Sequence, residues 1–227
     1  GDANQRITED YLRILRFFRF YAQYCDPMQG MDPNGLAACA ANAEGIETLS
    51  KERIGAEMRK LLTAVDPAPA MASMQASGVL LRVLPAADSQ FLAVLVMLEQ
   101  SQNLPPSWLR RLAVIGADGA AEALVLSKSE QKHLKRMGQG LSPAETSYRF
   151  GRAVALDDAL VLAATLGSPM PADIQAQITL GTKAVFPVKA ADLMPDIPAG
   201  PALGAKLRAL EDQWIKSGFV LDKADLL

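Results

Sequence analysis

RITEDYLRILRFFRF, residues Arg6–Phe20, is the stretch that decides how this chain folds at its N-terminal end. An α-helix through it would separate a charged stripe from a set of large apolar side chains. The stripe consists of Arg6, Glu9, Asp10 and Arg13, with Arg16 at its edge. The apolar set, expected in a core, is Leu12, Ile14, Leu15 and Phe18. Such a stripe is commonly a solvated helix face, where each ion pair contributes about 0.3–0.5 kcal/mol.

The composition indicates a globular, helical protein. The chain has 227 residues, of which 50% are hydrophobic, and it is rich in alanine and leucine with few β-branched runs. We therefore expect an all-α fold with no significant sheet. The net charge of −2 gives no overall basic field. The longest apolar run, residues 91–98, is too short to cross a bilayer. Cys25 and Cys39 are expected to be reduced thiols in a cytoplasmic protein, without a metal site.

Several local signals mark where helices begin. Ser50 precedes a helix predicted over residues 51–64, whose buried side would carry Ile54, Met58, Leu61 and Leu62. Ser127 and Ser142 each stand three residues before a glutamate, which is the capping-box spacing. Pro201 is placed to start a further helix, predicted over residues 202–217, on which Trp214 is expected in the core.

A locally basic segment lies between residues 128 and 152. Its six cations are Lys128, Lys132, Lys135, Arg136, Arg149 and Arg152, against two acids, Glu130 and Glu145. It is the best electrostatic candidate for contact with a nucleic-acid backbone, since phosphate contacts supply most affinity that does not depend on sequence. A merely solvated face carries about equal weight. His133 lies in the segment without a metal co-ligand, and we interpret it as incidental.

Three stretches, in order along the chain, resemble a known family. They are the Glu9-Asp10-x-x-Arg13 motif, GIETLSKERIGAEMRKLL (Gly45–Leu62), and DL…GPALGAKLRALEDQWIKSGF within residues 192–219. All three are similar to the class II tRNA nucleotidyltransferases, which include CCA-adding enzymes and bacterial poly(A) polymerases. The resemblance implies an elongated helical array, with a neck at residues 1–64, a body at 65–140 and a tail at 141–227.

The first motif has a direct chemical interpretation. Cytosine and adenine both present an amino donor beside a ring-nitrogen acceptor, whereas uracil and guanine present the opposite order. A carboxylate accepts hydrogen bonds and a guanidinium donates them, so an Asp–Arg pair selects C and A. Mismatched polar groups would stay unpaired, which can reject a wrong base by roughly 10⁴-fold. The resemblance assigns Asp10 to the amino group, Arg13 to the ring nitrogen, and Glu9 to orienting Arg13.

The resemblance also implies the remaining parts of the site. Arg6, Arg16, Arg53 and Glu57 would support the nucleotide-binding residues, and we expect Arg53 and Glu57 to brace the Arg6–Phe20 helix. The basic segment would hold the tRNA acceptor arm. Gly200 and Gly204, in a Gly-Pro-x-x-Gly turn, would either present a helix N-terminus to a phosphate or simply start a helix.

Catalytic groups are missing from this sequence. Nucleotidyl transfer needs clustered carboxylates for two divalent cations, such as Mg²⁺, and a Gly-rich phosphate loop, and neither pattern occurs here. The adjacent Asp157 and Asp158 cannot face one site from a helix. We therefore expect an inactive fragment with no catalytic residue, using CTP and ATP only together with an N-terminal head. That head would cover apolar surface around Ile7, Tyr11 and Phe17.

Two alternatives remain open. One keeps the family and changes the product to poly(A) or to only part of CCA, because the motif pairs with both C and A and cannot separate these products. The other is a helical RNA-binding or scaffold module without catalysis, in which Glu9 and Arg13 only form an ion pair. No partner in a membrane is expected.

Overall fold

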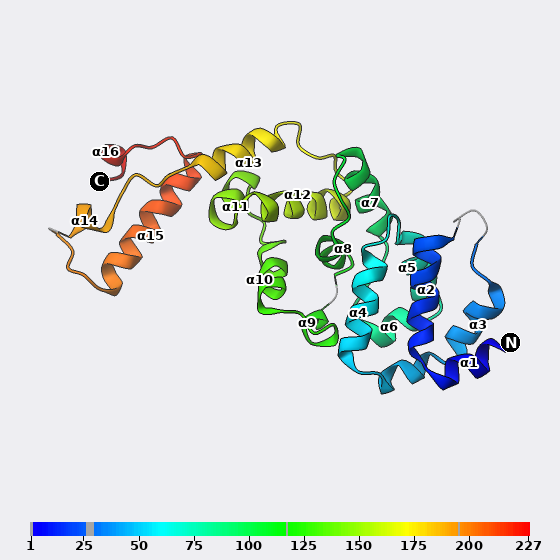
Figure 1. Cartoon of the computed structure of the whole chain (residues 1–227). Coiled ribbons are helices and arrows are strands. Elements are labelled where there is room, and N and C mark those ends of the chain that lie inside the picture. Colours follow the sequence, from blue (N-terminus) through cyan, green and yellow to red (C-terminus); the bar gives the residue numbers. More distant parts are fainter. Residues whose placement is uncertain (1, 26–29, 117, 195) are drawn as a thin grey trace. The chain divides into compact units, whose positions relative to one another are not determined.

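The structure is a computed structural model that describes residues 2–25, 30–116, 118–194 and 196–227. Every regular element in these ranges is a helix, and no strand occurs in them, which confirms the all-α fold class (Figure 1). Two compact units make up the chain: unit 1 is Gly1–Gln139 with Asp157–Met170, and unit 2 is Gly140–Leu156 with Pro171–Leu227. The neck, body and tail division stays a prediction.

The helices of unit 1 are joined by short connections. They are α1 (Ala3–Glu9), α2 (Leu12–Tyr24), α3 (Pro33–Ala41), the 3₁₀ helix η2 (Ala43–Thr48), α4 (Lys51–Leu62), α5 (Ala68–Ala76), α6 (Val79–Val83), α7 (Leu92–Ser101), α8 (Trp108–Val114), α9 (Ala120–Ala123) and α10 (Lys128–Arg136). Unit 2 contains α11 (Pro143–Phe150), α13 (Ile174–Lys183), α14 (Ala190–Leu193), α15 (Pro201–Lys216) and α16 (Lys223–Leu226). The helix α12 (Arg152–Leu166) contributes residues to both units.

The N-terminal stretch is two helices, so the prediction of one continuous helix was wrong. Asp10 is extended, with φ −155° and ψ 103°, and its carboxylate accepts a hydrogen bond from Leu12 N at 3.1 Å. Aspartate is well suited to this capping position because its side chain satisfies a free N–H group. The break also turns Tyr11 against η2, where a Cβ on Gly45 would lie 2.1 Å from the ring.

The other helix predictions hold closely. Leu12, Ile14, Leu15 and Phe18 are buried, and α4 packs on α2 through its own predicted apolar side. Ser50 caps α4 by accepting from Arg53 N at 3.4 Å. Gly55 lets α4 approach the chain closely at Leu124, because a Cβ there would lie 2.4 Å from the Leu124 carbonyl oxygen.

The apolar surface expected at Ile7, Tyr11 and Phe17 is only partly exposed. Ile7 is buried, and the rings of Tyr11 and Phe17 pack over Gly45 and Gly35. Glycine at both positions provides the room, since a Cβ on Gly35 would lie 2.7 Å from the Phe17 ring. That expectation was therefore wrong for Ile7, and the two well-exposed rings of α2 are those of Phe20 and Tyr24.

Unit 2 is built around aromatic rings. Trp214 on α15 is buried, as predicted, and its ring centroid lies 4.9 Å from Phe219 and 5.5 Å from Tyr148. Gly181 brings α13 into backbone contact with α11, because a Cβ there would lie 1.9 Å from the Ala144 carbonyl oxygen. None of the helices within the described ranges has the length and apolarity needed to span a bilayer.

Candidate functional site

Glu9 and Arg13 lie across the break between α1 and α2. Arg13 Nη1 donates to Glu9 Oε2 at 2.7 Å and to the Arg6 carbonyl oxygen at 2.6 Å. The predicted contact between Glu9 and Arg13 is therefore present. Both side chains are well exposed, at 56% and 41%. Among the described residues, Nε and Nη2 of Arg13 have no hydrogen-bond partner, so these donors remain unused.

Asp10 is held by α4. Its two carboxylate oxygens each lie 3.0 Å from Arg53 Nη2. Burial raises the pKa of Asp10, but the hydrogen bond from Leu12 N and the charge of Arg53 outweigh it, so the pKa is lowered from its usual value of 3.8. Asp10 is thus an ionised carboxylate that is already paired with Arg53 on one side, and Arg16 adds a further positive charge nearby.

A second ion pair ties α4 to α2. Glu57 is buried on α4, and its Oε2 accepts from Arg19 Nε at 2.6 Å. Lys60 contacts the other oxygen of Glu57 at 3.4 Å. Arg53 and Glu57 therefore contact the segment that they were predicted to brace, although Arg53 reaches Asp10 itself.

Together these contacts create a donor and an acceptor at the surface. Arg13 N bonds to the Asp10 carbonyl oxygen at 3.0 Å, so the two residues stay one turn apart despite the break. In the part of the chain that the structure describes, Asp10 Oδ2 accepts only from Arg53, and a carboxylate oxygen can accept more than one hydrogen bond. The arrangement can pair with a group that presents a donor beside an acceptor.

The basic segment is divided between the two units. Lys128, Lys132 and Lys135 are exposed at i, i+4 and i+7 on α10, which gives one positive helix face in unit 1. Arg136 follows them at the end of the same helix. Ser127 and Glu130 form the predicted capping box, so the helix that carries these lysines begins at Lys128, directly after the predicted cap.

The remaining basic residues lie in unit 2 and have partners. Arg149 donates to Glu145 at 2.8 Å and to Asp212 at 2.6 Å, and Arg152 bonds to Gln175. Gly200 and Gly204 lie at the start of α15, which begins at Pro201 and has no side-chain cap. A Cβ on Gly204 would meet nothing closer than 4.0 Å, so packing does not require glycine there.

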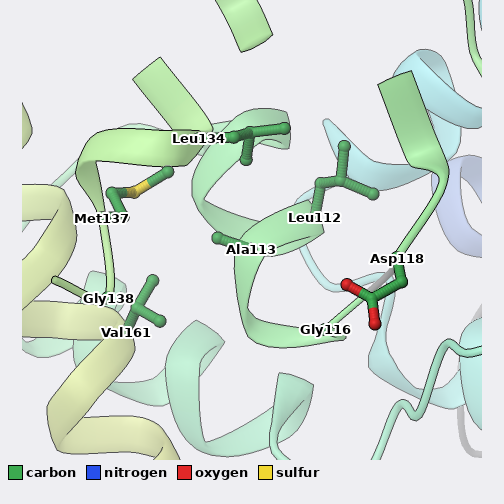
Figure 2. Close-up of a pocket in the computed structure, with 8 residues that line it drawn as sticks. All are labelled: Leu112, Ala113, Gly116, Asp118, Leu134, Met137, Gly138 and Val161. Atoms are coloured by element: carbon green, nitrogen blue, oxygen red, sulfur yellow. The ribbon is translucent and has the colours of Figure 1, made fainter. Parts of the chain in front are cut away.

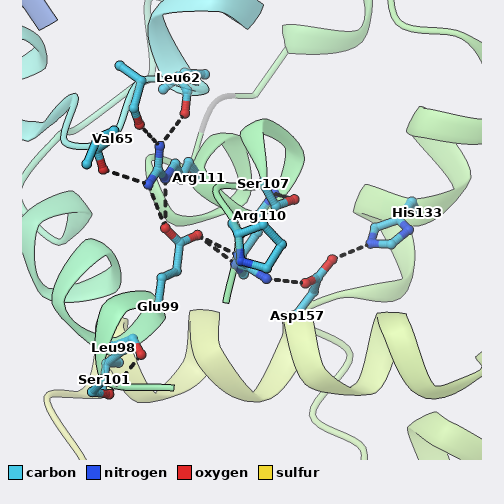
Figure 3. A network of polar contacts seen from close by, with 12 residues as sticks. Leu62, Val65, Leu98, Glu99, Ser101, Ser107, Arg110, Arg111, His133 and Asp157 are labelled. Atoms are coloured by element: carbon cyan, nitrogen blue, oxygen red, sulfur yellow. Dashed lines mark hydrogen bonds and ion pairs between the residues drawn. The ribbon is translucent and has the colours of Figure 1, made fainter. Parts of the chain in front are cut away.

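A buried network of charges was missed by the sequence analysis (Figure 3). Glu99, 1% exposed, pairs through Oε1 with Arg110 and through Oε2 with Arg111, each at 2.7 Å. Arg110 continues to Asp157 at 2.8 Å, and Asp157 reaches His133 Nε2 at 2.9 Å. His133 is therefore a member of the network, which corrects its interpretation as incidental. The available signal was Glu99, an acid that directly follows the apolar run of residues 91–98 on α7.

Arg111 connects this network to the end of α4. Its Nη1 donates to the carbonyl oxygens of Leu62 and Ala64, and its Nη2 to that of Val65 at 3.2 Å. Carbonyls at a helix C-terminus have no intrahelical donors, and Leu62 is the last residue of α4. One buried guanidinium therefore satisfies this carbonyl and two that follow the helix. The network is consequently structural, and it fixes α4 against α7 and α8.

A pocket of about 240 Å³ is lined by residues that include members of α8, α10 and α12 (Figure 2). Its larger apolar lining residues are Leu112, Leu134, Met137 and Val161, and Asp118 is its acidic side chain. Within the described part of the chain, no group of three His, Cys, Asp or Glu side chains could hold a metal ion.

The chain is similar to known proteins over most or all of its length. The family described as "Probable RNA and SrmB- binding site of polymerase A" matches residues 30–91. The mitochondrial CCA tRNA nucleotidyltransferase 1 of mouse is 31% identical over 244 residues, and that of human is 28% identical over 246. Each alignment covers 100% of this chain and 56% of the relative, so the chain spans little more than half of their length.

Solved structures share the fold. The Bacillus stearothermophilus CCA-adding enzyme in complex with CTP matches with a TM-score of 0.69 at 21% identity, covering 96% of this chain and 60% of that one. The Thermotoga maritima enzyme complexed with tRNA matches at 0.62 and 14% identity, covering 98% and 61%. The likeness to the curated relatives agrees with the three motifs, and the likeness to the solved structures agrees with the helical architecture: the chain is similar to the body and tail region of class II CCA-adding enzymes.

Proposed function

We propose that this chain is the nucleotide- and RNA-recognition region of a tRNA nucleotidyltransferase that adds CCA to tRNA 3′ ends from CTP and ATP. The observation that carries the proposal is the partly exposed pair of Arg13 and Asp10: within the described ranges, two donor nitrogens of Arg13 have no partner, and Asp10 has acceptor capacity left. Relatives named as CCA tRNA nucleotidyltransferases align with the whole chain and supply the substrate class.

Base selection follows from the fixed hydrogen-bonding character of the two side chains. Arg13 donates to the ring nitrogen of C or A, and Asp10 accepts from the amino group. Glu9 holds Arg13 in place through Nη1 and leaves its other nitrogens for the base. Arg53 keeps Asp10 ionised, because its positive charge lowers the pKa of the carboxyl group. U and G would place an acceptor against Asp10 and a donor against Arg13.

RNA is held elsewhere on the same region. The lysine face of α10, Lys128, Lys132 and Lys135, contacts phosphates of the acceptor arm, and Arg136 lies at its end. Arg149, Arg152 and the turn with Gly200 and Gly204 are weaker candidates, because both arginines already have partners within unit 2.

The bond-forming chemistry belongs to a part of the protein outside this chain. Two Mg²⁺ ions held by clustered carboxylates would activate the 3′ hydroxyl and stabilise the leaving pyrophosphate there. We propose that the chain alone is inactive. A poly(A) polymerase is the second candidate, and the matched family description, which names polymerase A, favours it specifically.

Nucleotide incorporation by the full-length protein tests the proposal. Transfer RNA lacking its 3′ CCA is offered CTP, ATP, GTP or UTP, singly and together. Addition of C and A that stops after CCA is expected, and Arg13→Ala is expected to admit U and G. Arg82→Ala, which removes an exposed arginine paired with Glu44 and Glu47, serves as the matched control and should leave selection unchanged. Long A tails without C would favour the polymerase, and absence of incorporation would contradict both enzymes.

A further inference from the structure

The helix α4 contacts different parts of unit 1 with its two sides. On one side, Arg53 pairs with Asp10 of the proposed base-selecting site. At 3.6 residues per turn, Gly55 and Arg59 lie toward the other side of the helix. That side faces α9 and the turn at residues 124–126, which leads into α10 (Figure 1). One helix therefore connects the proposed base-selecting site with the helix that carries the lysine face.

Arg59 holds the turn that leads into α10. Its Nη1 donates to the Leu124 carbonyl oxygen and its Nη2 to the Val125 carbonyl oxygen, each at 3.1 Å. The same Nη2 lies 3.5 Å from Oε2 of Glu130, which closes the capping box of α10. The guanidinium carbon lies 4.7 Å from the ring centroid of Trp108 on α8. One side chain thus joins α4 and α8 to the start of α10.

The backbone of this turn is strained. Val125 has φ 50°, a left-handed conformation that β-branched residues rarely adopt. Such a conformation persists only where the surrounding contacts fix it. Leu124 is buried beside it, and its carbonyl oxygen lies so close to Gly55 that a Cβ there would be 2.4 Å away. The close approach at Gly55 and the two hydrogen bonds from Arg59 supply the contacts that fix the turn.

Apolar burial contributes little to placing α10. None of its residues, all of which the structure describes, is buried. The lysine face is exposed, whereas Glu130 and His133 are partly buried on the inner side of the helix. Polar contacts hold that side: Arg59 pairs with Glu130 at the start of the helix, and Asp157 with His133 in its middle. The place of the lysine face therefore depends on these contacts.

We propose that Arg59 is a positioning residue for tRNA binding, because it fixes the lysine face of α10 relative to the base-selecting pair of Arg13 and Asp10. This rests on the proposed function and adds to it a residue that touches neither base nor phosphate. Both terminal nitrogens of Arg59 already donate to protein oxygens, and its side chain is only 29% exposed. Arg59 thus acts through α10.

A double-mutant cycle in the full-length protein tests the proposal. The variants are Arg59→Gln, Lys128→Gln/Lys132→Gln and their combination, and the probe is tRNA lacking its 3′ CCA, followed by fluorescence anisotropy. We expect Arg59→Gln to weaken tRNA binding about fivefold and the lysine variant to weaken it about tenfold. Because Arg59 acts through the lysines, adding Arg59→Gln to the lysine variant should cost less than about twofold more.

Nucleotide incorporation separates positioning from a general loss of structure. Arg59→Gln should raise KM for tRNA and leave KM for CTP and the preference for C over U unchanged, because the contacts of Asp10 and Arg13 are intact. Circular dichroism and the denaturation midpoint give the folded fraction of each variant. A parallel rise in KM for tRNA and for CTP would overturn the proposal.

Two control variants separate geometry from charge. Lys51→Gln removes one cation from the same side of α4, where Lys51 pairs with the exposed Glu122, and it should bind tRNA within twofold of the unchanged protein. Arg59→Lys keeps the positive charge but loses the planar fork that reaches two carbonyls. We therefore expect it to bind tRNA almost as weakly as Arg59→Gln.

The contradicting results are distinct from failure of the proposed function. Full tRNA affinity in Arg59→Gln or in Arg59→Lys would overturn the positioning role. Losses that multiply in the combined variant would also overturn it, because they would mean that Arg59 acts independently of the lysines. A lysine variant with unchanged tRNA affinity would instead contradict the RNA site on α10 in the proposed function, and the positioning role with it.

Discussion

Unit 1 contains two groups of paired acidic and arginine residues, which share residue types but differ in burial and in function. Glu9, Asp10, Arg13 and Arg53 pair at the surface, where side-chain exposure ranges from 29% to 56%. Glu99, Arg110, Arg111 and Asp157 pair in the interior, where side-chain exposure is between 1% and 13%. The surface group keeps unused donors and acceptors, whereas the buried group saturates its own. Burial, and not residue type, thus separates a site that can bind a ligand from a structural connection.

The energies of the two groups differ for the same reason. Exposed ion pairs contribute about 0.2–1 kcal/mol, because water and salt screen them. Removing one partner of a buried pair leaves an uncompensated charge and typically costs about 3–5 kcal/mol. Substitutions in the surface group should therefore cost little stability, whereas substitutions in the buried group should cost several kcal/mol.

The largest expected effect is that of Arg111→Met. It removes a partner of Glu99 and the donor to the carbonyls of Leu62, Ala64 and Val65, while nearly preserving apolar volume. We expect the free energy of unfolding to fall by about 3–5 kcal/mol, measured by urea denaturation. Arg82→Met is the exposed control and should cost less than about 1 kcal/mol. Equal losses of unfolding free energy in Arg111→Met and Arg82→Met would contradict the distinction between buried and exposed ion pairs.

A smaller effect is expected from Asp157→Asn. The amide still accepts a hydrogen bond, but it no longer compensates the charge of Arg110. Glu99 remains beside Arg110, so we expect a loss of about 1.5–3 kcal/mol in the free energy of unfolding. An unchanged denaturation midpoint would show that Glu99 alone balances both arginines.

Substitution of the neighbouring residue, Asp158→Asn, should maintain or raise the free energy of unfolding, in contrast to Asp157→Asn. Burial raises the pKa of Asp158, and the hydrogen bond from Gly138 N at 2.6 Å offsets this only in part. The folded protein therefore binds this proton more tightly than the unfolded chain, so its ionisation costs stability as pH rises above 3.8 through the raised pKa. Because an asparagine oxygen can still accept from Gly138 N, stability at pH 7 should be equal or up to about 1 kcal/mol higher.

Thermal denaturation between pH 4 and pH 8 tests the direction of this change in stability. The gain from Asp158→Asn should grow as pH rises through the window in which the carboxyl group ionises. A loss of stability at pH 7 comparable to that of Asp157→Asn would contradict the assignment.

The smallest effect on stability is expected from Arg53→Gln. Asp10 has a lowered pKa, so its pairing contributes above the ordinary value of 3.8 and is lost as pH falls through the lowered pKa. Without Arg53, the pKa of Asp10 should move upward in a carboxyl titration followed by NMR. Stability at pH 7 should change by less than about 1 kcal/mol. A pKa that does not move would exclude Arg53 as a cause of the shift.

Local chemistry made much of the fold predictable from the sequence. Ser50, Ser127 and Ser142 cap the helices that follow them, because the capping bond joins residues only three apart. The apolar side of α4 was predictable from its helical period in the same way.

Contacts between distant residues were not predictable in this way. The break at Asp10 depends on Tyr11 finding room over Gly45, and the buried network joins Arg110 to Asp157, 47 positions away. Helical periodicity gives the face on which a residue lies but not its partner on another helix. The resemblance found the residues of the surface group, while the pairing of Asp10 with Arg53 required the structure.

The most direct test of the distinction between the surface group and the buried group compares Arg13→Ala with Arg111→Met in the full-length protein. Nucleotide selectivity and denaturation midpoint are measured for both variants. The account predicts that Arg13→Ala admits U and G with its midpoint nearly unchanged, and that Arg111→Met lowers the midpoint while its folded fraction still selects C and A. Unchanged selectivity in Arg13→Ala, together with a loss of stability as large as that of Arg111→Met, would contradict it.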